Sequence, residues 1–149
     1  MKTELTTIGW REWISLPELG LPFIKAKIDT GARTSCLHAF DVKPFNKDSE
    51  EWVRFGIHPY QNDSGREIYC EAKVLDKRTV TDSGGHKEER YVISTKLELP
   101  DKQYLTAEIT LSNRDSMRFR MLLGRTAMET NFTVNPAESY MLGKPTNKG

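Results

Sequence analysis

One stretch near the start of the chain, FIKAKIDTGARTSCLHA at residues 23–39, constrains the fold more than any other. Its apolar residues alternate through residues 23–28, as in a half-buried strand, and a second apolar run follows at residues 36–39. Between the two runs lies DTGA, residues 29–32, in which aspartate and glycine favour a tight turn. The pattern predicts two core strands with the carboxylate of Asp29 at the turn between them.

A second apolar stretch lies far downstream, where MLLGR at residues 121–125 predicts a strand ending in Gly124-Arg125. The next residues, 126–129, predict a short helix. Together the two stretches resemble the retropepsin-like aspartic proteases, in which a hydrophobic strand with DTGA opens the subunit core and a hydrophobic segment with Gly-Arg closes it. DTGA alone is a weak signal, and its combination with LLGR is a specific one.

The fuller pattern is KIDTGARTSCLHA, RFRMLLGRTAM and FTVNPAESYMLG, and the resemblance spans residues 8–143. It is similar to a bacterial branch of the family that carries the label ATP-dependent zinc protease and is encoded near glutamate ligases that modify ribosomal protein. The resemblance implies a retropepsin-like acid protease barrel, a peptide or protein as substrate and a homodimer as the active form.

The rest of the chain predicts an all-β fold, because short alternating runs are separated by turn signals and the one short helix follows LLGR. We expect a single domain over residues 1–149, with residues 1–7 frayed and residues 43–51 in a surface loop. Residues 132–134 and 140–142 are candidates for closing strands. A β-barrel without any activity would explain most of these residues equally well.

Composition narrows the class of function. The net charge of +1 gives no reason to expect a nucleic-acid partner, and no apolar run is long enough to predict a membrane span or a signal peptide. Cys36 and Cys70 lie in apolar, strand-like contexts, which predicts reduced core thiols in a cytoplasmic protein, although a disulfide between them remains an alternative. There is no internal repeat, so a two-domain protease with a DTG in each half is excluded.

The resemblance implies hydrolysis of peptide bonds by two carboxylates that share a proton, one activating a water and the other protonating the carbonyl oxygen. A chain with one DTG supplies only Asp29, so the active site is expected at a two-fold axis between two copies. Gly31 is expected to allow the tight backbone and Thr30 to hydrogen-bond across the dimer. Ala32 offers no hydroxyl to the carboxylate, so we expect activity nearer neutral pH than in relatives with serine there.

Each of these side chains also has a plain structural interpretation. Asp29 could cap an ordinary Asx turn. In retroviral relatives the arginine of Gly-Arg pairs with an aspartate just after DTGA, but here that position is Arg33. Arg125 is therefore expected to pair with Glu129 or Glu138, or to face the site. Arg33 and Arg125 are either solvated charges or ligands for the carboxylates of an acidic peptide.

A protease of this kind needs a flap, and residues 79–90 (TVTDSGGHKEER) are the best candidate, with Gly84 and Gly85 at a hairpin tip. The alternative is an ordinary exposed hairpin. The histidines His38, His58 and His86 form no HExxH, the sequence has no CxxC, and no GKS or GKT is present, so we predict neither a metal nor a nucleotide cofactor.

The sequence thus favours a homodimeric aspartic endopeptidase. A second hypothesis is a non-catalytic module with a protease-like barrel that captures peptides or partners a protein-modifying enzyme. A metallohydrolase using Asp29 and His38 is a third and weaker one.

Overall fold

The computed structural model describes residues 5–59, 66–81, 84–112, 119–128 and 131–143. The first half of the chain contains the elements β1 (Thr6–Ile8), β2 (Arg11–Leu16), the 3-10 helix η1 (Pro17–Leu19), β3 (Leu21–Ile28), β4 (Ser35–His38), β5 (Phe40–Lys47) and β6 (Glu50–Ile57). The second half contains β7 (Ile68–Lys73), β8 (Asp76–Thr81), β9 (Lys87–Glu98), β10 (Tyr104–Ser112), β11 (Met121–Leu123), α1 (Arg125–Met128) and β12 (Phe132–Val134).

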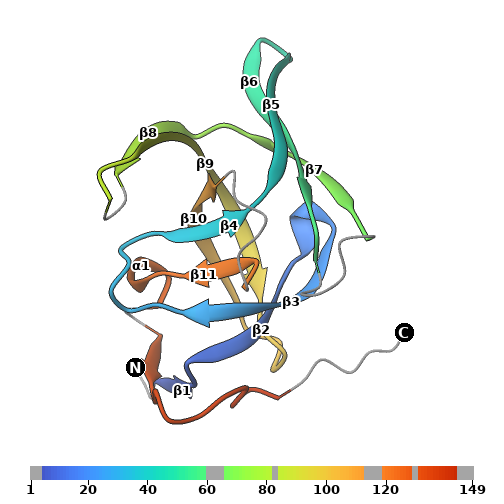
Figure 1. Ribbon diagram of the computed structural model, residues 1–149. Coiled ribbons are helices and arrows are strands. Elements are labelled where there is room, and N and C mark those ends of the chain that lie inside the picture. The colour runs from blue at the N-terminus through green and yellow to red at the C-terminus, as the bar shows by residue number, and fades with distance from the viewer. Residues whose placement is uncertain (1–4, 60–65, 82–83, 113–118, 129–130, 144–149) are drawn as a thin grey trace.

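The main sheet has the strand order β10-β4-β11-β3-β2-β9-β8, and β10 also pairs with β9. The sheet therefore closes on itself, and β8 continues from β9 outside the ring (Figure 1). Two pairings matter for function because they are parallel: β11 lies beside β3, and β10 lies beside β4. The first of these brings the DTGA and Gly-Arg segments together. The predicted all-β fold with one short helix after LLGR is confirmed.

The core lies inside the closed sheet and follows the predicted alternation. The strand predicted from the alternation in residues 23–28 is β3, which begins two residues earlier, and Ile24 and Ala26 are fully buried while Lys27 is exposed. The fully buried large side chains come from eight of the strands: Ile8, Ile14, Leu16, Leu21, Ile24, Leu37, Phe55, Ile57, Ile93, Leu97, Ile109 and Met121. No helix in the described ranges is long and apolar enough to cross a bilayer.

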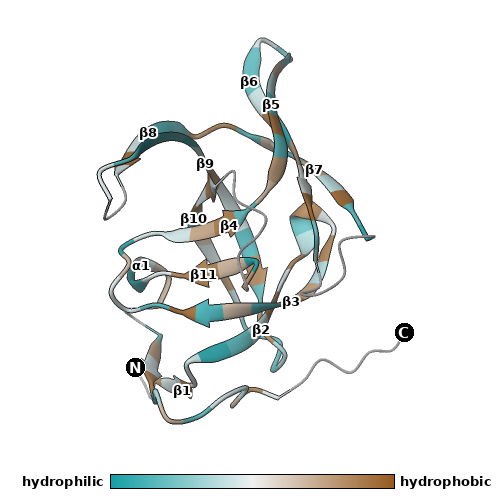
Figure 2. Cartoon of the chain, viewed as in Figure 1, coloured by the Kyte–Doolittle hydropathy of each residue, from teal (hydrophilic) through white to brown (hydrophobic). Residues whose placement is uncertain are grey.

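The prediction of a loop over residues 43–51 is wrong. These residues belong to β5 and β6, a hairpin that turns at Asp48 and Ser49, both with left-handed backbone (φ 54° and 65°). The hairpin projects from the body of the protein, and its tip is hydrophilic (Figures 1 and 2). Because most side chains of β5 are exposed, that strand carries no apolar alternation for a sequence reading to detect.

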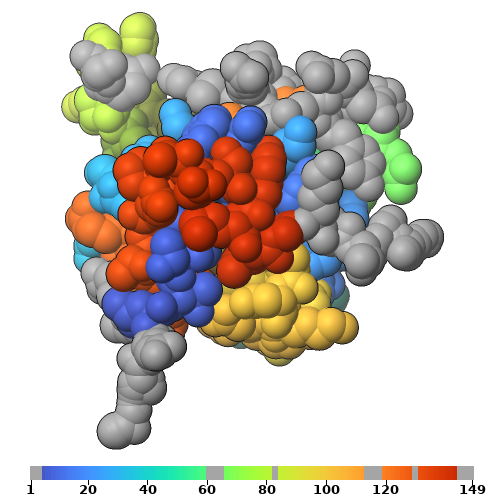
Figure 3. Space-filling view, turned by 90° about the horizontal axis from the view of Figure 1, so that it is seen from below, coloured from blue at the N-terminus to red at the C-terminus, as the bar shows by residue number. Residues whose placement is uncertain are grey.

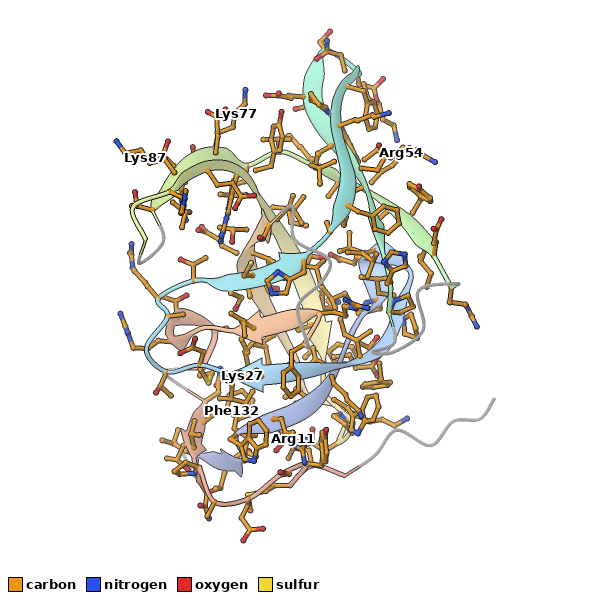
Figure 4. All side chains as sticks on the ribbon, in the orientation of Figure 1. Arg11, Lys27, Arg54, Lys77, Lys87 and Phe132 are labelled. Carbon is orange, nitrogen blue, oxygen red and sulfur yellow. The ribbon has the colours of Figure 1, made fainter. Side chains whose placement is uncertain are left out.

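The two ends of the described chain are joined more firmly than predicted. Thr6 and Thr7, expected to fray, pair in parallel with β12 as part of β1. Residues 140–142 form a turn and not a strand, and the Tyr140 amide donates to the Arg11 carbonyl (2.9 Å). The C-terminal segment covers the N-terminal strands on the lower face (Figure 3), and Arg11 and Phe132 mark that end of the barrel (Figure 4).

Candidate active site

Asp29 is the first residue after β3, and its backbone is fixed by the neighbouring strand. Its amide donates to the Leu123 carbonyl (2.9 Å), and this bond extends the parallel pairing of β3 with β11 by one step. The side chain of Asp29 is half-buried. The structure therefore places the carboxylate at the end of a core strand, as predicted.

The DTGA turn is closed by local hydrogen bonds. The Gly31 amide donates to Asp29 Oδ1 (3.0 Å), and the Ala32 amide donates to the Asp29 carbonyl (3.2 Å). The Asx turn considered as the structural alternative is thus present, and it orients one carboxylate oxygen of the proposed catalytic acid. Thr30 is exposed at the tip, so its hydroxyl is accessible to a second molecule.

The prediction for Gly31 needs a correction. Gly31 does not adopt a left-handed backbone, and a Cβ there would lie 3.4 Å from Asp29 Oδ1, an ordinary contact distance. Within one chain the turn therefore needs the Gly31 amide as a donor, but it does not need glycine for conformational freedom. The position that requires glycine is Gly124, because a Cβ there would lie 2.5 Å from the carbonyl carbon of Thr34.

The Gly-Arg segment is hydrogen-bonded to the DTGA turn and to the start of β4. The Gly124 amide donates to the buried Ser35 hydroxyl (2.9 Å), and the Arg125 amide donates to the Ala32 carbonyl (2.7 Å). The amide and hydroxyl of Thr126 both donate to the Arg33 carbonyl, at 3.0 and 2.9 Å. These bonds join the start of α1 to the second half of the DTGA turn, although the two segments are far apart in sequence.

The hydrogen-bond partner of the Arg125 side chain belongs to the DTGA turn. Its Nη1 donates to the Thr30 carbonyl (3.1 Å), and the described residues offer it no ion pair. Of the two predicted acidic partners, Glu138 is exposed and makes no ion pair with it, and Glu129 lies outside the described residues. Arg125 therefore restrains the residue that follows Asp29. Arg33 is exposed and makes no ion pair within the described ranges.

The predicted flap is a hairpin beside this turn. Strands β8 and β9 pair from Asp76↔Val92 to Thr81↔Lys87, and Gly85 has a left-handed backbone (φ 86°) near the tip. The hairpin curls out beyond the loop between β3 and β4 (Figure 1), and its Lys77 and Lys87 extend away from the body (Figure 4). Arg78 links it to β10 by a 3.1 Å ion pair with Glu108. Gly84 is exposed on the same hairpin, and residues 82 and 83 lie outside the described ranges.

A cavity of about 400 Å³ lies between the turn and the hairpin. The turn contributes Ala32, Arg33 and Thr34 to its wall, and the hairpin contributes Arg78, Thr79 and Val80. A smaller hollow of about 320 Å³ adjoins it and shares Arg33, Thr34 and Arg78. The cavity lining therefore begins three residues after Asp29, and the hairpin covers part of it, as a flap would.

Sequence reasoning missed several residues that line this cavity. Cys36 and His38, predicted as core residues, are buried but face the cavity, and Arg90 reaches it from β9. Both cysteines are free thiols, and burial raises the pKa of the Cys36 thiol above its usual value, with Arg90 and the nearby hydroxyls of Thr110 and Ser112 opposing the rise. The signal that could have found these residues is polar residues at alternate positions of a strand that is otherwise apolar.

No group of three histidine, cysteine, aspartate or glutamate side chains suited to a metal ion occurs in the part of the chain that the structure describes. The sequence prediction that the chain needs no metal therefore stays a prediction.

Comparison with known proteins decides the family. The RimB-like family model, described as retropepsin-like aspartic endopeptidase RimB, matches residues 7–145. The chain belongs to the RimB-like family. The match includes both DTGA and LLGR and covers nearly the whole sequence, so the retropepsin-like resemblance is confirmed at the level of family.

Curated relatives of this RimB-like chain carry a different name. A probable alpha-L-glutamate ligase of Shewanella pealeana is 47% identical over 137 residues, which are 92% of this chain and 30% of the relative. One from Desulfotalea psychrophila is 48% identical over 137 residues, with 92% and 29% covered. The chain therefore spans less than a third of these relatives, so a RimB-like segment occurs in them as part of a longer protein.

A solved structure supports the fold. A Legionella pneumophila protein of unknown function superposes with a TM-score of 0.74 and 26% identity, covering 93% of this chain and 98% of that one. The RimB-like barrel is therefore shared with an experimentally determined structure across almost its full length.

Proposed function

We propose that this RimB-like chain is an aspartic endopeptidase that acts as a homodimer, with Asp29 of each copy contributing one carboxylate to the active site. The observation that carries the proposal is the placement of Asp29. Its carboxylate is half-buried at the end of a core strand, and the Gly31 amide fixes one of its oxygens at 3.0 Å. An ordinary Asx turn would contain the same hydrogen bond, so the catalytic interpretation is favoured by the occurrence of this turn in the DTGA motif of a RimB-like chain.

The homodimer follows from the need for a second carboxylate. Within the described residues, Asp29 makes no hydrogen bond or ion pair with another carboxyl group, and the chain has one DTG. A symmetric dimer about a two-fold axis would supply an identical Asp29. The exposed Thr30 lies at the tip of the same turn, where its hydroxyl could join the two copies.

In the proposed mechanism the two Asp29 side chains share one proton because two like charges at short range cannot both be ionised. The ionised carboxylate takes a proton from a water, which attacks the carbonyl carbon of the peptide bond. The protonated carboxyl group gives its proton to the carbonyl oxygen. Collapse of the tetrahedral species then breaks the C–N bond, and the departing nitrogen receives the proton that the first carboxylate took from the water. A hydroxyl of the same species returns its proton to the second carboxylate, which restores the shared proton.

We extend the proposal to acidic or glutamate-bearing peptides as substrates. Two observations support this choice: Arg33 is an exposed cation beside the turn without an ion-pair partner in the described part of the chain, and RimB-like segments occur in proteins named as glutamate ligases. Arg125, which was also a candidate, already donates to the Thr30 carbonyl and is better assigned to supporting the turn. Cleavage that ignores glutamate on either side of the scissile bond would contradict this extension.

The test is cleavage of a mixed peptide library by the wild type, by Asp29→Asn and by the control Asp41→Asn. Asparagine keeps the shape of Asp29 and removes its acid–base chemistry, so we expect a loss of roughly 10²–10⁴-fold. Asp41 is an exposed aspartate on β5, so the control should retain full activity. Equal cleavage by the wild type and Asp29→Asn would reject the assignment. Peptide binding without any cleavage would reject the enzyme in favour of a non-catalytic binding module.

A further inference from the structure

The floor of the 400 Å³ cavity is made of buried polar side chains on the face of the sheet that lies opposite the hydrophobic core. It is formed by the parallel strands β4 and β10, where Cys36 lies opposite Thr110 and His38 lies opposite Ser112. Alternate residues of a strand share a face, so these four side chains all line the cavity. The residues between them, Leu37 and Leu111, are buried in the hydrophobic core. One face of this strand pair is therefore core, and the other is a polar floor.

Ser112 has only a weak partner on that floor, the thiol of Cys36. Its side chain is fully buried, and its hydroxyl makes no hydrogen bond of ordinary geometry to any described residue, although it lies near the weakly accepting thiol of Cys36. Leaving a buried hydroxyl unsatisfied is costly. A group that enters the cavity from outside would remove that cost.

Arg90 provides a cation in the same place. Glu88 accepts from its Nε at 2.8 Å and holds one edge of the guanidinium, while Nη1 points to Cys36 Sγ at 3.7 Å. The Arg90 side chain is only 16% exposed. Because sulfur is a weak acceptor and a guanidinium has five donors, Nη1 can exchange this contact for a stronger one with an oxygen anion.

The charge of the lining selects the kind of occupant. Arg33, Arg78, Arg90 and His38 contribute to the cavity wall, and no described carboxylate does. The acidic partners of Arg78, which are Asp76 and Glu108, are not part of this wall. An anionic side chain would therefore meet basic groups and no described carboxylate in the wall itself, although Glu88 behind Arg90 offsets part of that positive charge. An apolar or basic side chain would leave polar groups unsatisfied.

We propose that the cavity beneath the β8–β9 hairpin is a specificity pocket for an acidic side chain of the substrate, in which Arg90 binds the carboxylate and Ser112 donates a further hydrogen bond. The proposal rests on the proposed peptidase function, because the pocket begins three residues after Asp29. It goes further by assigning selectivity to Arg90 on β9 and to the buried Ser112 of the floor, which sequence reasoning did not select.

The test uses two libraries of decapeptides that are identical except for glutamate or glutamine at one fixed position. Each library is assayed for cleavage by wild-type protein and, separately, for retention on immobilised Asp29→Asn protein. Retention does not require catalysis, so the two readouts separate the pocket from the peptidase. The same measurements are made with Arg90→Met and Ser112→Ala, each introduced alone and also combined with Asp29→Asn.

Wild-type protein should prefer glutamate over glutamine by about tenfold or more, as expected for a hydrogen bond to a charged group. Arg90→Met should reduce the preference to near unity, and Ser112→Ala should reduce it by a smaller factor. Because both libraries are measured on the same preparation, the ratio does not depend on how much of a variant folds. The control is Arg54→Met, an exposed arginine on β6 that should keep the wild-type ratio (Figure 4).

Retention without a preference for glutamate would overturn the pocket, as would a preference that survives Arg90→Met. Glutamate-selective, Arg90-dependent retention without cleavage by the wild type would uphold the pocket and reject the peptidase. Cleavage that Asp29→Asn abolishes, with no selection for glutamate, would uphold the peptidase and reject the pocket.

Discussion

At the scale of single residues, the site depends on how closely two backbone segments approach. The Gly124 amide is bonded to Ser35 at 2.9 Å, and no space remains for a side chain at Gly124 because of the Thr34 carbonyl. Gly31, the more familiar glycine of the DTG motif, has no such neighbour within the chain. The two glycines should therefore respond differently to the same substitution.

We predict that Gly124→Ala destabilises the protein and that Gly31→Ala does not. A Cβ at residue 124 would meet backbone at 2.5 Å, so the chain must shift, at a cost of about 1–3 kcal/mol or more. At residue 31 the backbone is compatible with alanine, and the free energy of unfolding should change by less than about 1 kcal/mol. Urea denaturation measures both values. Equal stability of the two variants would show that the approach at Gly124 is looser than described.

At the scale of elements, the β8–β9 hairpin is held to the barrel by few contacts. The ion pair of Arg78 with Glu108 joins β8 to β10, and both side chains are substantially exposed, at 38% and 49%. Exposed pairs contribute little to global stability. Their loss can still loosen the hairpin, which is also joined to β6 by a 3.6 Å ion pair between Lys77 and Glu51.

We predict that Glu108→Gln leaves the free energy of unfolding within about 1 kcal/mol of wild type but speeds amide hydrogen exchange in β8 and the start of β9. Glu50→Gln is the matched control, since Glu50 forms an exposed ion pair with Lys73 at 2.7 Å on the other hairpin. The control should leave exchange in β8 unchanged. Protection of β8 that is the same in wild type and Glu108→Gln would mean that this ion pair does not restrain the hairpin.

Sequence patterns predicted the elements that face a core on one side. Strand β3 was found because burial of one face requires apolar residues at every second position. Strand β5 was missed because most of its side chains are exposed to solvent. Asp29 and Gly124 were found through their motifs, but Arg90 and Ser112 were not, since their meeting depends on the register of β9, β10 and β4.

At the scale of the whole molecule, one buried carboxylate ties the two ends of the described chain together. Glu12 is fully buried and accepts from the amides of Gly9 (2.7 Å), Met141 (2.9 Å) and Leu142 (3.2 Å). The C-terminal segment is thereby fixed across the start of β2, on the face shown in Figure 3. This arrangement explains why residues 140–142 need no strand pairing to close the fold.

We predict that Glu12→Gln lowers the free energy of unfolding by about 1–3 kcal/mol, because an amide has one accepting oxygen and brings donors into a site that already has three. Glu138→Gln, at an exposed position, should change it by less than about 0.5 kcal/mol. Chemical denaturation followed by tryptophan fluorescence measures both. If Glu12→Gln has the stability of wild type, the hydrogen bonds between Glu12 and the three amides contribute nothing to the free energy of unfolding.

The proposed active site belongs to two copies of the chain, and a mixing experiment tests that proposal most directly. Wild-type and Asp29→Asn chains are unfolded together, refolded at constant total concentration and assayed on a peptide that the wild type cuts. If each copy supplies one Asp29, only wild-type pairs are active, so activity falls as the square of the wild-type fraction and an equal mixture retains about one quarter. A linear fall, with about half the activity in the equal mixture, would show that one chain suffices and would contradict the shared site.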